Sequence, residues 1–194
     1  MIDHRTDRSK QKVIDVIFCH SNVRIGILAY MSIPVVSAND EVIGYKERTD
    51  IDPAVDIVRS ASLWITNPSG DILLAQRKFT KRNNPGKWSE AVGGTVEGND
   101  DYESTMLREA EEEIGFTVNE YELGPKQYVS SPAKYFVQWY TVVIDQPIEA
   151  FSAQEEELEQ LAWISEEQFI AELENTPEKY IDEMQEIARL FIKF

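Results

Sequence analysis

The sequence predicts one mixed α+β domain, and chain length, strand patterns and helix signals all contribute to that fold class. The chain has 194 residues, of which 42% are hydrophobic, so it is long enough for one domain with a sizeable core. Residues 41–47, 59–66 and 71–76 have strand patterns, and an Asn-Pro-Ser-Gly turn at 67–70 joins the last two as a hairpin. A helix is expected at residues 100–115. Strands on both sides of a helix predict a mixed α+β domain.

The remaining elements are predicted from local patterns. Residues 88–96 are expected to form a short strand that carries Gly93 and Gly94. Two further strands and two terminal helices follow, at residues 126–131, 135–144, 165–174 and 177–194. Residues 1–34 show no clean helical or strand period, so we expect an N-terminal extension there and one domain over residues 35–194.

Charge and cysteine content limit the classes of partner. Nineteen Lys and Arg against 35 Asp and Glu give a net charge of −16, which disfavours a nucleic-acid polymer. The single cysteine, Cys19, excludes an intramolecular disulfide and favours a reducing, cytoplasmic setting. No stretch reaches the roughly 18 apolar residues of a membrane span, so no membrane partner is expected. A small phosphorylated substrate remains suitable if a divalent cation offsets the repulsion.

The helix at residues 100–115 is expected to carry apolar side chains on one face and acidic side chains on another. Asp100 with Glu103 is expected to form a capping box at its start, and Gly115 to end it. Three apolar side chains at helical spacing form an expected buried stripe, Leu107, Ala110 and Ile114. Three carboxylates form another face, Glu109, Glu112 and Glu113. Like charges at this spacing destabilise an ordinary helix, whereas a hard divalent cation such as Mg²⁺ or Mn²⁺ reverses that effect.

This stretch resembles the Nudix box, usually written GX5EX7REUXEEXGU with U a bulky aliphatic residue. Six positions fall in register: Gly94, Arg108, Glu109, Glu112, Glu113 and Gly115. Three positions depart from the pattern. Asp100 replaces a glutamate, Ala110 is small for its position, and Phe116 is aromatic where an aliphatic residue is usual. None of these changes removes a carboxylate from the expected metal cluster.

The resemblance implies a fold, a reaction and residue roles. The fold is an α/β/α sandwich with a mixed central sheet, and the reaction is hydrolysis of a diphosphate linkage by water attack at phosphorus with Mg²⁺, or Mn²⁺, as cofactor. Glu109, Glu112 and Glu113 are the implied metal ligands, with Glu112 also a candidate general base. Arg108 is expected to orient these glutamates. Because the base varies within the family, Glu156 and Glu157 remain candidates.

Residues outside the box resemble the branch of the family related to isopentenyl diphosphate isomerase. Arg77 and Lys81 match the diphosphate-binding positions of that branch, and Arg59 adds a third candidate for substrate binding. The isomerases carry a catalytic cysteine just before the box and a metal-binding histidine two residues later, where this chain has Gly93 and Thr95. The substrate is expected to be selected by the loops around Trp88, residues 126–134 and Trp139.

A Mg²⁺-dependent diphosphohydrolase, acting as a monomer or a homodimer, is therefore the function that the sequence favours. One alternative is a Nudix domain that senses a phosphorylated metabolite without turnover, although the intact box argues against it. The other is isopentenyl diphosphate isomerisation, for which the expected acid and base are missing.

Overall fold

The computed structural model describes residues 32–193. The expected N-terminal extension therefore lies outside the described residues, except for its last three. Strand β1 (Ser32–Val36) begins at that point, and all five of its residues are buried. The chain thus enters the folded domain by residue 32, before the start at residue 35 that the sequence suggests.

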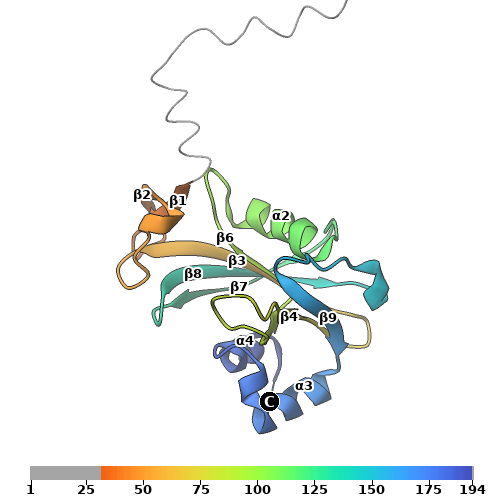
Figure 1. The fold of residues 1–194 in the computed structure, drawn as a ribbon. Coiled ribbons are helices and arrows are strands. Elements are labelled where there is room, and N and C mark those ends of the chain that lie inside the picture. Colours follow the sequence, from red (N-terminus) through yellow and green to blue (C-terminus); the bar gives the residue numbers. More distant parts are fainter. Residues whose placement is uncertain (1–31, 194) are drawn as a thin grey trace, which may run out of the picture.

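Nine strands and three α-helices make up the described part of the chain (Figure 1). After β1 the strands are β2 (Val42–Glu47), β3 (Ile57–Thr66), β4 (Ile72–Arg77), β5 (Trp88–Glu90), β6 (Val92–Thr95), β7 (Glu122–Val129), β8 (Lys134–Val143) and β9 (Leu158–Ile164). The helices are α2 (Tyr102–Ile114), α3 (Glu166–Asn175) and α4 (Met184–Phe191). None of these helices is long and apolar enough to cross a membrane.

The sheet is mixed and is organised around β3. This strand pairs in parallel with β8 over its whole length and antiparallel with β1, β4 and β6. Strand β4 in turn pairs antiparallel with β5 and β9. Figure 1 shows α2 on one side of the sheet and α3 with α4 on the other. The expected α+β class and α/β/α sandwich are confirmed.

Two hydrophobic clusters hold these layers together. On one face Met106, Ala110 and Ile114 of α2 are fully buried against β3, while the expected Leu107 packs at the edge of the cluster. On the other face Phe169 of α3 and the α4 side chains pack against Trp64 of β3. Alternation along β3 produces this division, because successive side chains point to opposite faces of a sheet.

The expected strand at residues 88–96 is split into β5 and β6 at Ala91. Strands β3 and β4 pair directly only at Thr66 and Ile72, next to their hairpin, and then diverge. The segment between Trp88 and Thr95 lies where the two strands have separated, and it pairs with both of them. Strand β5 pairs with β4, and β6 pairs with β3. One continuous strand was the wrong expectation because the segment changes its partner halfway.

The ends of two helices also differ from expectation. The N-cap of α2 is Asp101 and not Asp100, since the Asp101 carboxylate accepts the Ser104 N–H at 2.8 Å and Ser104 Oγ accepts the Asp101 N–H at 2.9 Å. Gly115 does end this helix, with a φ of 64° that favours glycine. The last helix, α4, begins only at Met184.

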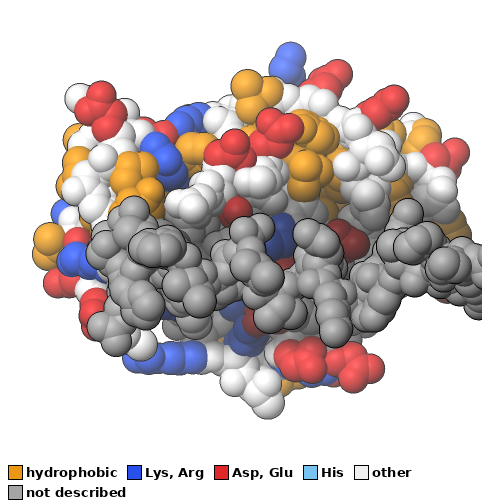
Figure 2. Space-filling model, turned by 90° about the horizontal axis from the view of Figure 1, so that it is seen from above, with side chains coloured by type: hydrophobic (Ala, Val, Ile, Leu, Met, Phe, Trp, Pro, Cys, Tyr) orange, Lys and Arg blue, Asp and Glu red, His pale blue; other side chains and the backbone are white. Residues whose placement is uncertain are grey.

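The surface agrees with the acidic composition. On the face shown in Figure 2, Lys and Arg side chains occur singly or in small groups among acidic and apolar ones.

We expect Leu173→Ala to lower the free energy of unfolding by about 2–5 kcal/mol, because the side chain is 2% exposed in the cluster beneath α3 and α4. The same substitution at Leu123, which is 73% exposed, is the control and should change it by less than about 0.5 kcal/mol. Urea unfolding followed by fluorescence measures both. Equal effects at the two positions would contradict the assigned core.

Candidate active site

Helix α2 contacts β6 closely through two glycines. Gly94 faces Glu109, and a Cβ atom built on Gly94 would overlap the Glu109 carboxylate. The next glycine back, Gly93, donates its N–H to Glu113 Oε2 at 2.9 Å. Absence of a side chain at position 94 therefore allows the helix to bring its carboxylates against the strand.

Arg108 holds two of the three box glutamates. Its guanidinium lies 2.9 Å from Glu109 Oε1 and 2.9 Å from Glu112 Oε2, with Asp100 at 3.4 Å. Partial burial lowers the Arg108 pKa, but the charges of Glu109 and Glu112 outweigh it and raise that pKa overall. These contacts are the ones expected of a residue that orients the glutamates.

Glu113 carries the most perturbed carboxyl of the box. Burial raises its pKa to about 8, opposed by the Gly93 N–H and reinforced by the charges of Glu109, Glu90 and Glu157. Burial also raises the pKa of Glu109 despite its contact with Arg108. Within residues 32–193 Glu113, unlike Glu109 and Glu112, has no ion-pair partner, so its buried carboxyl lies in an environment that favours a bound cation.

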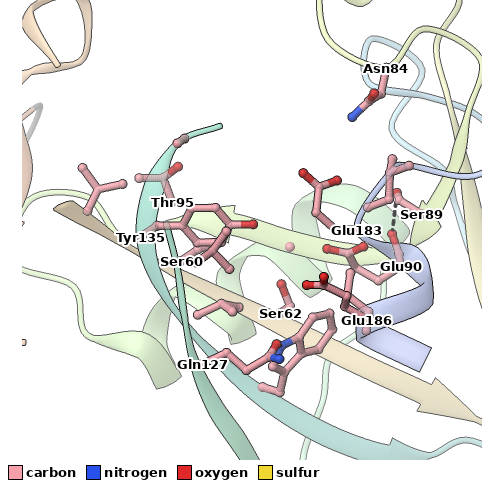
Figure 3. A pocket seen from close by; sticks show the side chains of 18 of the residues that line it. Ser60, Ser62, Asn84, Ser89, Glu90, Thr95, Gln127, Tyr135, Glu183 and Glu186 are labelled. Atoms are coloured by element: carbon pink, nitrogen blue, oxygen red, sulfur yellow. Dashed lines mark hydrogen bonds between the residues drawn. The ribbon is translucent and has the colours of Figure 1, made fainter. Parts of the chain in front are cut away.

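A cavity of about 660 Å³ opens beside Glu113, on the sheet face that carries α4 (Figure 3). Its floor is formed by alternate side chains of β3 and β8, and its walls by β5, β6, the loop after β7 and the start of α4. The polar lining residues include Ser60, Ser62, Arg77, Asn84, Ser89, Glu90, Thr95, Gln127, Tyr135, Glu183 and Glu186. Glu113 belongs to the lining although its helix is on the other face, because β3 and β4 diverge at this point.

Of the three expected substrate-binding residues, only Arg77 lines this cavity. It extends from the end of β4, and its Nε donates to the Asn83 carbonyl oxygen at 3.2 Å. The Arg77 charge also lowers the pKa of Glu90, which burial raises overall.

Arg59 and Lys81 are engaged elsewhere. Arg59 points to the opposite face of β3, where it pairs with Asp40 at 2.7 Å and lies over the Tyr102 ring. Strand alternation explains this placement, since the neighbours of Arg59, Val58 and Ser60, are the residues that line the cavity. Lys81 lies 2.5 Å from Glu157 and is not among the lining residues. The structure therefore separates the three basic residues that the sequence grouped.

The later acidic segment approaches the box at one point. The backbone of Gln154 donates to the Glu113 carbonyl at 2.9 Å, and the charge of Glu157 contributes to the raised Glu113 pKa. Glu156 is exposed. Glu157 is thus the member of the pair that lies near the box.

Several cavity residues were missed by the sequence reasoning. Glu183 and Glu186 come from a terminal helix that carries no motif, and nothing in the sequence places that helix over β8. Tyr135 and Glu90 lie in strands, and the sequence does not determine to which face of the sheet their side chains point. The expected selection loops are partly found, because Gln127, residues 128–131 and Trp139 line the cavity.

Comparison with known proteins identifies the class. A model of the NUDIX domain matches residues 56–184, most of the chain, and the chain therefore belongs to the Nudix family. Members of this family generally act on pyrophosphate bonds and generally use a divalent metal.

The relatives are distant and partial. An uncharacterized Nudix hydrolase of Streptomyces coelicolor is 35% identical over 81 residues, which is 42% of this chain and 45% of that protein. The uncharacterized Nudix hydrolase YfcD of Escherichia coli is 26% identical over 140 residues, 72% of this chain and 76% of YfcD. An isopentenyl-diphosphate Delta-isomerase of Serratia proteamaculans is 29% identical over 83 residues, 43% of this chain and 46% of that protein. The chain spans about half the length of several curated relatives that it matches.

The fold is shared with solved structures. The crystal structure of DR0079 from Deinococcus radiodurans superposes with a TM-score of 0.72 at 22% identity, covering 83% of this chain and 99% of that one. At this identity the likeness establishes the fold alone.

The residues at the site fit a hard divalent cation. Its preferred ligands are oxygens, and the box offers carboxylates whose mutual repulsion such a cation would relieve. Within residues 32–193 no three acidic, His or Cys side chains form a ready metal cluster, and Glu109 and Glu112 are instead paired with Arg108.

We expect Gly94→Ala to weaken Mn²⁺ binding by about 10- to 100-fold, because the new Cβ displaces the Glu109 carboxylate. The fold should persist, since the overlapping atoms belong to a flexible side chain. Gly44→Ala is the matched control, because no atom lies within 4 Å of its Cβ position. Electron paramagnetic resonance of Mn²⁺ gives the affinities. An unchanged affinity in Gly94→Ala would remove Glu109 from the metal site.

Proposed function

We propose that this protein is a Mg²⁺-dependent hydrolase that cleaves a diphosphate linkage in a small nucleoside or organic diphosphate, by water attack at phosphorus. The observation that carries the proposal is the arrangement of the box. Glu113, one of the three box glutamates, lines the same cavity as Arg77, so a carboxylate suited to a metal and a guanidinium suited to phosphate face one space.

In this proposal Glu109, Glu112 and Glu113 hold the cation, and Mn²⁺ is an acceptable substitute for Mg²⁺. Bound there, the cation supplies charge neutralisation for phosphoryl oxygens and acidifies a water molecule. Arg108 positions Glu109 and Glu112 through its two ion pairs. Arg77 binds the diphosphate oxygens, for which its planar guanidinium has the suitable geometry.

The general base is assigned to Glu112, with Glu157 as the alternative. Glu112 is half exposed and bound to Arg108 at 2.9 Å, so it has room to accept a proton from water. Glu157 lies near Glu113 and is paired with Lys81 at 2.5 Å. Because both carboxylates are paired with a cation, ion pairing does not separate them, and Glu112 is preferred for its place in the box and its greater exposure, 51% against 40% for Glu157.

Isomerisation is disfavoured because the cysteine and histidine that the isomerases use are missing. Gly93 and Thr95 line the cavity at the positions where the isomerases carry cysteine and histidine, and the β8 side chains that reach it are Tyr135, Val137 and Trp139. A metabolite-sensing domain is disfavoured because all three box glutamates are retained.

We expect Glu113→Gln and Glu112→Gln each to lower turnover of a diphosphate substrate by at least about 100-fold, because each removes a charge that the metal-bound transition state uses. Glu111→Gln on the exposed side of the same helix is the control and should leave turnover unchanged. Phosphate release with Mg²⁺ from a panel of diphosphates measures the rates. Full activity of the Glu113 variant in EDTA would contradict the metal mechanism.

We expect Arg77→Ala to raise KM by about 10- to 100-fold, since a charge-assisted hydrogen bond to phosphate contributes about 1.5–3 kcal/mol. Arg189→Ala, on the exposed face of α4, is the charge-matched control. Arg59→Ala tests the separation of the basic residues. An equal rise of KM in Arg59→Ala would mean that the cavity is not where the diphosphate binds.

A further inference from the structure

The wall of the cavity opposite the box is acidic and has no role in the proposed chemistry. Glu183 and Glu186 lie at the start of α4 and line the cavity. Neither side chain has a hydrogen-bond or ion-pair partner within residues 32–193. Neither one caps the helix, because the N-cap position of α4 has no side-chain hydrogen bond. Two unpaired carboxylates therefore face a space that is expected to receive a substrate.

Glu90 of β5 adds a third carboxyl to this wall. Its Oε2 atom is buried and has no hydrogen-bond partner, which is costly unless a ligand supplies a donor. Figure 3 shows Glu90, Glu183 and Glu186 grouped on one side, with the ring of Tyr135 across from them. The buried and unpartnered oxygen of Glu90 is an observation separate from the acidity of α4, and it points to a bound group that donates hydrogen bonds.

Tyr135 shows that these charges converge on the same space. Burial raises the pKa of its hydroxyl to about 12, and the charges of Glu183, Glu90 and Glu186 add to that effect. The Tyr135 hydroxyl has no hydrogen-bond partner among residues 32–193. Its ring offers a face to a cation, and aromatic faces attract cations most when water is excluded.

A second metal ion does not account for this wall. The cavity volume of about 660 Å³ is that of a site for an organic molecule and not for an ion. An organic cation with several N–H donors suits carboxylates that are spread along a wall.

We propose that the part of the substrate beyond the diphosphate carries a positively charged amino group, which binds among Glu90, Glu183, Glu186 and the ring of Tyr135. This inference rests on the proposed function, because it assumes that the diphosphate lies at Arg77 and the box. The two ends of the substrate then meet opposite charges. Arg77 and the metal bind the anionic end, while the α4 wall binds the cationic end.

The test compares aminoalkyl diphosphates of three to six carbons with hydroxyalkyl diphosphates of the same length, which differ only in the ammonium group. Dissociation constants are measured by titration calorimetry in Ca²⁺, and kcat/KM is measured in Mg²⁺. The amine should bind about tenfold more tightly at one or more lengths, as a charged hydrogen bond provides. Equal affinity of the two series, or absence of amine binding, overturns the inference.

Substitutions at Glu183 and Glu186 test whether these residues cause the preference for the amine. Glu183→Gln with Glu186→Gln should reduce the amine-to-hydroxyl affinity ratio toward one. Glu167→Gln with Glu174→Gln, an equal charge change on the exposed side of α3, is the control and should leave the ratio unchanged. A loss of helix-dipole stabilisation at α4 would lower the unfolding midpoint but not this ratio. A ratio that survives the double variant overturns the assignment to α4.

The two proposals fail in different ways. Hydrolysis of both series at equal rates leaves the diphosphohydrolase in place and removes the amine site. Tight amine binding in Ca²⁺ without hydrolysis of any diphosphate in Mg²⁺ retains the amine site and removes the hydrolase.

Discussion

The close contact between α2 and β6 is the constraint on which the site depends. The helix is fixed by its apolar face, because Met106, Ala110 and Ile114 are fully buried in the core. The packing of the apolar face also fixes the position of the acidic face. Glu109 lies against Gly94, and Glu113 accepts a hydrogen bond from the Gly93 N–H. Carboxylates that repel one another are held together by packing energy from the opposite side of the same helix. This division is why one short segment contributes both to folding and to chemistry.

The divergence of β3 and β4 connects the two faces of the sandwich. Were the two strands paired along their whole length, the sheet would separate the box helix from α4. Because β5 and β6 change partners at Ala91, the Glu113 side chain reaches the cavity that α4 covers. The order of strands in the sheet therefore determines which residues share the site, and α4 belongs to it although it lies far away in sequence.

Sequence reasoning succeeded where a local pattern was sufficient. The box helix, its end at Gly115, the hairpin and the mixed sheet follow from signals within a few residues. It failed where the position of a residue depends on which face of the sheet its side chain points to, or on which strand or residue it pairs with. Arg59 and Arg77 look equivalent in sequence, but Arg59 points away from the cavity because its position on β3 alternates with Ser60. The capping residue shifted from Asp100 to Asp101 because the hydroxyl of Ser104 completes the reciprocal bonds, a choice that composition alone leaves open.

Electrostatics then restricts how an acidic protein handles an anionic substrate. The chain carries a net charge of −16, and the cavity holds one guanidinium, Arg77, against Glu90, Glu113, Glu183 and Glu186. A diphosphate entering alone would meet net repulsion, whereas a divalent cation at the box reverses the local sign. In the proposed function, metal and substrate therefore raise each other's affinity by the same factor, since coupling between two sites is reciprocal. In the proposed amine site the carboxylates of α4 act on the other end of the ligand, so they would contribute to selectivity and not to the reaction.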